Sequence, residues 1–192
     1  MEYQGLNSPC KQRAVKEWIK KFKLCVCIII ESNFRKEFVD SKLKYIFGGW
    51  KTCHNCSQEN SARLVVGWDS TMVEVEVLWS STQLIHYKIT FNSNRQEVFC
   101  SLHYYFFFFF WGDLDRATLT SPGPWVVLGD CNIMRFGSEK IGGLPPNLDA
   151  MGEFNDCLAR NGLEDIKDKG RDSLGAMSKL GIEGSYVSWI GA

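Results

Sequence analysis

An excess of charge of either sign is missing from this sequence, in which 22 lysines and arginines balance 22 aspartates and glutamates. Proteins that bind nucleic acid on their own usually have a basic surplus, so we expect any affinity for DNA to be weak and non-specific. The sequence also has no glycine-rich phosphate loop and no internal repeat, which argues against P-loop and repeat proteins.

Long apolar runs are absent as well. The longest apolar stretch, Tyr104–Trp111, has eight residues, which is less than half of the roughly 20 that a membrane-spanning helix needs. The N-terminus lacks the order of charged, apolar and small residues that marks a signal peptide. We therefore expect an intracellular protein, nuclear or cytoplasmic, that is neither secreted nor bound to a membrane. No protein partner can be inferred.

The eight cysteines do not form a metal-binding pattern. Cys53-His54-Asn55-Cys56 has the spacing of zinc ligands, but no second Cys-x-x-Cys or histidine pair follows at a suitable distance. Cys25 and Cys27 fall on the same side of one predicted strand, which is poor disulfide geometry. We interpret the cysteines as mostly buried thiols in a reducing compartment.

Two apolar runs are each followed by an acidic residue. Trp125–Leu128 reads as a buried strand entered from a proline-rich turn, and Gly129-Asp130-Cys131-Asn132 comes directly after it. Leu24–Ile30 is a second such run, and we expect it to end at Glu31. Asp130 and Asn132, two positions apart, can face one pocket. Two strands that deliver acids to one edge are the minimum for a divalent cation and an activated water.

The N-terminal third predicts two helices. Ser8 can cap the first, Pro9 suits its first position, and an apolar stripe recurs at helical spacing; its members are Val15, Trp18, Ile19 and Phe22. We interpret this helix as packed on a sheet, with its lysines solvated, rather than as a DNA-contacting helix. The charged segment from Asn33 to Lys44 predicts a second helix that exits at Phe47-Gly48-Gly49-Trp50.

The middle of the chain predicts an antiparallel sheet of short strands separated by polar turns. The expected strands are Arg63–Trp68, Met72–Trp79, Gln83–Thr90 and Gln96–Tyr104. Later, an apolar stripe predicts a helix that closes at the pair Asn161-Gly162; it consists of Leu148, Met151, Phe154 and Leu158. Strands first and mixed elements afterwards favour an α/β sandwich over a doubly wound sheet.

Several of these segments, in this order, make up a longer pattern. They are Gln4-Gly5-Leu6-Asn7-Ser8-Pro9, Lys11-Gln12-Arg13-Ala14-Val15, Ile30-Glu31, Val66-Gly67-Trp68-Asp69, Glu76-Val77-Leu78, Trp125 to Asn132, Gly137-Ser138-Glu139-Lys140 and Phe154-Asn155-Asp156-Cys157. The pattern resembles the endonuclease domain of plant LINE-type (non-LTR) retrotransposons, in the endonuclease/exonuclease/phosphatase superfamily. The resemblance implies a sandwich of two mixed β-sheets flanked by helices. It also implies a single domain over 1–192, incomplete at the C-terminus.

The resemblance implies a magnesium-dependent hydrolase that nicks DNA, with Mg²⁺ or Mn²⁺ as cofactor. Glu31 matches the family's metal-binding glutamate. Asp130 matches the aspartate that handles the attacking water, and Asn132 matches the asparagine that holds the scissile phosphate. Tyr104 matches a tyrosine that reaches the phosphate, with Tyr105 an equally close neighbour.

Two departures from the family pattern weaken the expected activity. The family opens with Trp-Asn-x-Arg-Gly-Leu-Asn, and here Glu2 stands at the position of the metal-site asparagine; it can ligate a cation but adds charge. The family's Ser-Asp-His motif also has no counterpart before Ala192, and none of the three histidines lies near that end. Because loss of such a group typically removes about 10²–10⁴ in rate, we expect little or no nuclease activity.

Two alternatives stay open. The chain could be a non-catalytic, degenerate fragment that only binds nucleic acid weakly. It could also be a phosphoesterase of the same superfamily that acts on small phosphoesters.

Overall fold

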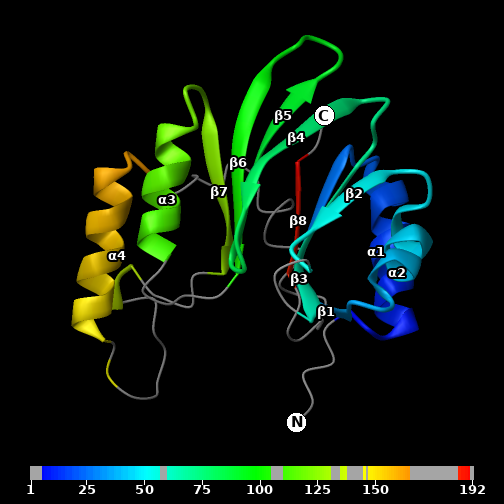
Figure 1. The fold of residues 1–192 in the computed structure, drawn as a ribbon, viewed down its shortest axis with the longest axis horizontal. Helices are drawn as coiled ribbons and strands as arrows, with labels where there is room; N and C mark the ends of the chain where they lie inside the picture. The colour runs from blue at the N-terminus through cyan, green and yellow to red at the C-terminus, as the bar shows by residue number, and fades with distance from the viewer. Residues whose placement is uncertain are drawn as a thin grey trace.

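The computed structural model describes residues 6–56, 60–104, 110–130, 135–137, 145, 147–164 and 186–190. Within these ranges the elements stack in four layers, with two helices outside each of two facing β-sheets (Figure 1). In chain order they are α1 (Pro9–Phe22), β1 (Val26–Arg35), α2 (Val39–Phe47), β2 (Lys51–His54), β3 (Ser61–Trp68), β4 (Val73–Ser80), β5 (Leu84–Phe91), β6 (Glu97–Tyr104), α3 (Phe110–Leu119), β7 (Trp125–Asp130), α4 (Leu148–Arg160) and β8 (Tyr186–Ile190).

The two sheets differ in the direction of their strands. The first sheet has the order β2-β3-β1-β8 and all its pairs are antiparallel. The second has the order β4-β5-β6-β7 and is mixed, because β7 runs parallel to β6 while its other pairs are antiparallel. The α/β sandwich expected from the sequence is therefore the observed fold. The prediction that the middle strands share one sheet is wrong, since β3 lies in the first sheet and β4 in the second.

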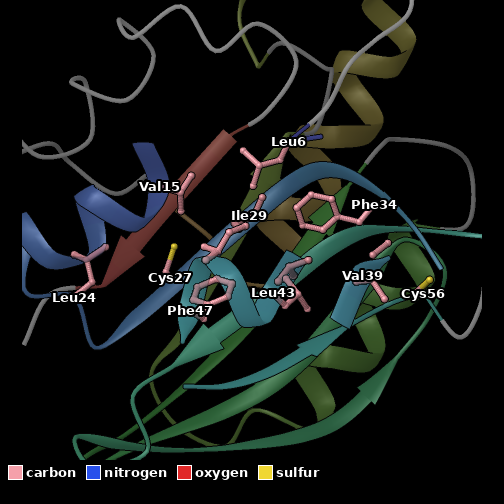
Figure 2. Close-up of a cluster of buried hydrophobic side chains, with 13 residues drawn as sticks. Leu6, Val15, Leu24, Cys27, Ile29, Phe34, Val39, Leu43, Phe47 and Cys56 are labelled. Atoms are coloured by element: carbon pink, nitrogen blue, oxygen red, sulfur yellow. The ribbon is translucent and has the colours of Figure 1, made fainter. Parts of the chain in front are cut away.

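Three apolar cores separate the four layers. The largest side chains of the first fill the space between the first sheet and helices α1 and α2, as Figure 2 shows for Ile29, Leu43 and Phe47. The second lies between the sheets and the third between the second sheet and helices α3 and α4. Strand β1 contributes side chains to two cores, because Ile29 faces the helices while Ile28 and Ile30 face the other sheet. Burial on both faces explains why its sequence is apolar without alternation.

Helix α1 begins where the sequence predicts, but two details differ. Ser8 is the N-cap residue, yet its side chain makes no capping hydrogen bond. Val15 is buried, whereas Phe22, expected on the same stripe, is 48% exposed. Gln12 is buried in its place, and its amide nitrogen donates to the carbonyl oxygen of Leu6 at 3.0 Å. The start of the described chain is thereby fixed against the first core.

The segment after Ile30 is the main error of the helix and strand predictions. Strand β1 continues past Glu31 to Arg35, and helix α2 begins only at Val39, so the helix expected from Asn33 is wrong in its first turns. The expected exit is confirmed, since α2 ends at Phe47 and Gly48 adopts a φ of 64°. Strand β2 was not predicted. It is a short strand at the sheet edge with little apolar character.

The last elements match the sequence more closely. Strand β7 is confirmed, although it lies at the edge of its sheet and is half-buried rather than buried. Helix α4 is confirmed and buries Phe154, while Leu148 is 71% exposed. Gly162 has the left-handed φ expected of a C-terminal cap, and Asn161 does not. No helix in the described ranges is long and apolar enough to cross a membrane.

Candidate active site at one edge of the two sheets

Strand β1 bulges at the predicted metal ligand. Ile30 pairs with Leu64 and Phe34 pairs with Ala62, so three residues of β1 face a single residue, Arg63, on β3. Glu31 has a φ of 58°, in the left-handed region that L-residues seldom adopt. A bulge of this kind re-aims side chains and is common beside active sites. Glu31 therefore lies in a re-aimed, locally strained segment instead of at a strand end.

Asn55 fixes the segment opposite the bulge. Its side-chain oxygen accepts hydrogen bonds from the backbone N–H groups of Arg63 (2.9 Å) and Leu64 (3.0 Å). Its amide nitrogen donates to the carbonyl oxygen of Thr82 at 2.8 Å, in the turn between β4 and β5 of the other sheet. Asn55 is fully buried. This one side chain therefore holds the start of β3 and ties the two sheets together.

Arg63 reaches across from the first sheet to the second. Its Nη1 atom donates to the hydroxyl oxygen of Tyr104 at 2.9 Å. Its guanidinium carbon also lies 5.1 Å from the centre of the Tyr104 ring, within cation–π distance. The delocalised charge of arginine tolerates partial burial better than an ammonium does. The bulge of β1 and the end of β6 are thus linked through Arg63.

The end of β6 lies beside the end of β7. Tyr104 pairs in register with Asp130, and His103 with Gly129. A Cβ atom at position 129 would be 2.3 Å from the carbonyl oxygen of His103 and 2.5 Å from its ring, so only glycine fits. His103 is 1% exposed, and burial lowers its pKa to about 4. The imidazole is therefore neutral at pH 7 and acts as a packing group that sets the spacing of the two strands.

The predicted site residues can now be placed. Glu31 and Tyr104 lie at the same edge of the sandwich, connected through Arg63, and the backbone of Asp130 lies beside Tyr104. Glu2, Tyr105 and Asn132 fall outside the described residues. The sequence analysis did not identify Arg63 or Asn55 as site residues. The available signal for Arg63 was its charge between Ala62 and Leu64 in an otherwise apolar strand, but Arg63 was interpreted only as the start of that strand.

The donors at this edge suit a hard cation. Mg²⁺ is commonly held by one or two carboxylates, with water and substrate phosphate completing its shell. Glu31 carries one carboxylate in the bulge of β1, and the backbone of Asp130, the last residue of β7, lies beside Tyr104 at the same edge. Across the described ranges no three or more histidine, cysteine, aspartate or glutamate side chains gather into a metal-binding group.

The Cys53–Cys56 motif has a structural role instead. Burial raises the pKa of the Cys53 thiol to about 12, so it stays protonated at neutral pH. His54 accepts a hydrogen bond from the backbone N–H of Cys56 at 3.3 Å. Asn55, between them, makes the bonds to β3 described above.

A cavity of about 560 Å³ lies at the opposite edge of the sheets. Its lining mixes both signs of charge and includes Lys51, Trp68, Glu74 and Arg95. Trp68 ends β3 and pairs with the first residue of β1, which places the cavity at the far end of both strands from Arg63 and Glu31. The cavity therefore does not belong to the candidate site.

No protein-family model matches the sequence, and no curated protein matches it. Among solved structures the fold is similar to the endonuclease domain of TRAS1, a telomere-specific non-LTR retrotransposon, with a TM-score of 0.60 and 14% identity over 85% of this chain and 69% of that chain. Weaker similarities are a humanized D. rerio TDP2 with 14 mutations (TM-score 0.46, 15% identity, 70% of this chain and 60% of that one) and the human Nocturnin catalytic domain with bound sulfate (0.41, 11%, 67% and 60%). At this identity, the likeness to the TRAS1 domain shows a fold of the endonuclease/exonuclease/phosphatase type.

Proposed function

We propose that this chain is a metal-dependent phosphodiester hydrolase related to the endonucleases of plant LINE-type retrotransposons, with DNA as its substrate. The observation that carries the proposal is that Glu31, Tyr104 and the backbone of Asp130 lie at one edge of the sandwich, although they come from three strands in two sheets. The fold supports the proposal, since the TRAS1 domain with a similar fold is an endonuclease domain.

Each residue has a chemical role in this proposal. Glu31, with Glu2, would hold Mg²⁺ or Mn²⁺, and the bound cation would polarise the phosphate and neutralise developing charge. The Tyr104 hydroxyl would donate a hydrogen bond to a phosphate oxygen, and Asn132 would hold the same phosphate. Asp130 takes the proton of the attacking water. We expect a low rate, because Glu2 adds a negative charge where the family pattern has a neutral asparagine.

Nicking of supercoiled plasmid in Mg²⁺ tests the proposal. Glu31→Gln and Asp130→Asn keep the size of the side chains but remove their charge, and each is expected to lower the nicking rate about 10²-fold or more. Glu74→Gln is the matched control, since Glu74 is an exposed carboxylate at the opposite edge. Equal rates for all four proteins, in samples shown to be folded by circular dichroism, would contradict the proposal.

A non-catalytic role in weak nucleic-acid binding is the second candidate. One observation favours it: the positive charge of Arg63 lies at the same edge as Glu31. Arg63 would repel a cation while attracting a phosphate. This candidate predicts DNA binding without nicking by any of the proteins above.

A further inference from the structure

Arg63 is a cationic side chain at the candidate site with no counterpart among the site residues expected from the sequence. We propose that Arg63 and Tyr104 together form a subsite for one phosphate group of a nucleic-acid backbone, with Arg63 as its source of positive charge. The inference deepens the proposed function by assigning the residue that binds the substrate's charge. It does not depend on hydrolysis.

The position of Arg63 is built by several elements. The side-chain oxygen of Asn55 accepts a hydrogen bond from the backbone N–H of Arg63, and the bulge of β1 lies opposite Arg63 in the sheet. Ser32, inside the bulge, donates from its hydroxyl to the carbonyl oxygen of Ala62 at 2.6 Å. Both neighbours of Arg63 along β3, Ala62 and Leu64, are fully buried. The backbone under Arg63 is thus held on both sides, which preorganises the guanidinium for a ligand.

The hydrogen-bond roles at the subsite favour an anion. A guanidinium donates through five N–H groups and accepts nothing. The Tyr104 hydroxyl accepts from Arg63, and a hydroxyl that accepts a hydrogen bond can also donate one. A phosphate oxygen offers acceptors to both groups, and arginine is suited to bidentate contact with phosphate. Two donors from two different sheets can thereby converge on one anionic group.

The negative charges around the subsite make a positively charged side chain necessary for phosphate binding. Glu31 lies in the bulge opposite Arg63, and Asp130 lies beside Tyr104. A phosphodiester approaching two carboxylates is repelled unless a positive charge at the same place offsets them. The chain as a whole does not attract a polyanion, because its formal net charge is zero. Arg63 supplies that charge next to the tyrosine.

Fluorescence anisotropy of a labelled DNA duplex, titrated with protein in EDTA over a series of salt concentrations, tests the subsite. Arg63→Gln is expected to weaken binding roughly 10-fold, the scale of one charge-assisted hydrogen bond. It should also reduce the slope of log K against log salt by about one, because one phosphate contact is lost. Arg63→Lys should keep the slope and recover part of the affinity, since lysine keeps the charge without the planar fork.

Arg95→Gln is the matched control, because Arg95 is an exposed arginine at the opposite edge, 3.4 Å from Glu74. It should leave the slope unchanged. Tyr104→Phe should weaken binding several-fold with the slope unchanged, because it removes a donor but no charge. If Arg63→Gln matched Arg95→Gln in affinity and slope, or if Arg63→Lys lost the slope as well, the proposal would be overturned.

A competition arm identifies the source of the phosphate. If inorganic phosphate displaces the duplex from the wild-type chain more than chloride does at equal ionic strength, and not from Arg63→Gln, then a free phosphate satisfies the subsite. If it does not, while Arg63 still governs duplex binding, the subsite recognises the diester in the chain. The binding assay contains EDTA and therefore does not depend on a divalent cation. Absence of nicking in the Mg²⁺ assay would contradict only the proposed function, and duplex binding that does not depend on Arg63 would contradict only this inference.

Discussion

Replacing Gly129 by alanine is expected to destabilise the protein by about 1–3 kcal/mol, the usual cost of forcing an extra methyl group into a packed site. The new Cβ would be 2.3 Å from the carbonyl oxygen of His103, and ordinary contacts begin at 3.4 Å. That oxygen belongs to the backbone of β6, so no side-chain rotation relieves the contact. Strands β6 and β7 must separate, which also moves Asp130 away from Tyr104.

Gly152→Ala is the matched substitution for this test. Gly152 lies exposed inside α4, and nothing is within 4 Å of the position its Cβ would occupy. Alanine there should stabilise by about 0.5–1 kcal/mol, because glycine loses more backbone entropy in a helix.

Thermal unfolding followed by circular dichroism measures both changes, at roughly 2–4 °C per kcal/mol for a chain of this size. The expected result is a lower Tm for Gly129→Ala and a slightly higher one for Gly152→Ala. A Gly129→Ala protein as stable as the wild type would refute the close approach of β6 and β7.

Two further predictions concern buried polar groups near the site. Burial lowers the pKa of His103 to about 4, below its value of about 6.5 in the unfolded chain. Between these two pH values the unfolded state therefore binds more protons than the folded state. The free energy of unfolding is highest above about pH 6.5 and falls by up to about 3 kcal/mol as the pH drops toward 4. Urea unfolding at several pH values should show this loss, and His103→Gln should reduce the pH dependence. Asn55→Ala should cost about 1–3 kcal/mol for each backbone donor, of Arg63 and Leu64, that loses its acceptor. A loss below about 0.5 kcal/mol, the range of neutral surface changes, would contradict the role assigned to Asn55.

Predictions from local pattern succeeded where one periodicity dominated. Strands β4, β5 and β6 were predicted within a few residues, because their polar turns are clear in the sequence. The run Leu24–Ile30 was correctly interpreted as a buried strand, since Ile28 and Ile29 serve cores on opposite faces. The sandwich fold also followed from the family resemblance, which is a comparison of whole motifs and not of single segments.

Predictions failed where the pairing partner decides the conformation. The residues after Ile30 are polar and charged, which favours a helix locally, yet pairing of Phe34 and Arg35 with β3 keeps them in the sheet. Strand β2 has too little apolar pattern to be found from sequence, and its residues are extended because they pair with β3. Helix or strand preference is a weak prior, and tertiary pairing overrides it.

The sequence by itself determined the apolar strand runs and the helix start at Pro9, because these depend on neighbours a few positions away. Only the tertiary structure decided that β3 and β4 enter different sheets, and that Arg63 meets Tyr104 over 41 residues of sequence. The physical reason is that a sheet edge gathers residues by strand order and register, and both are set by long-range pairing and packing rather than by local pattern.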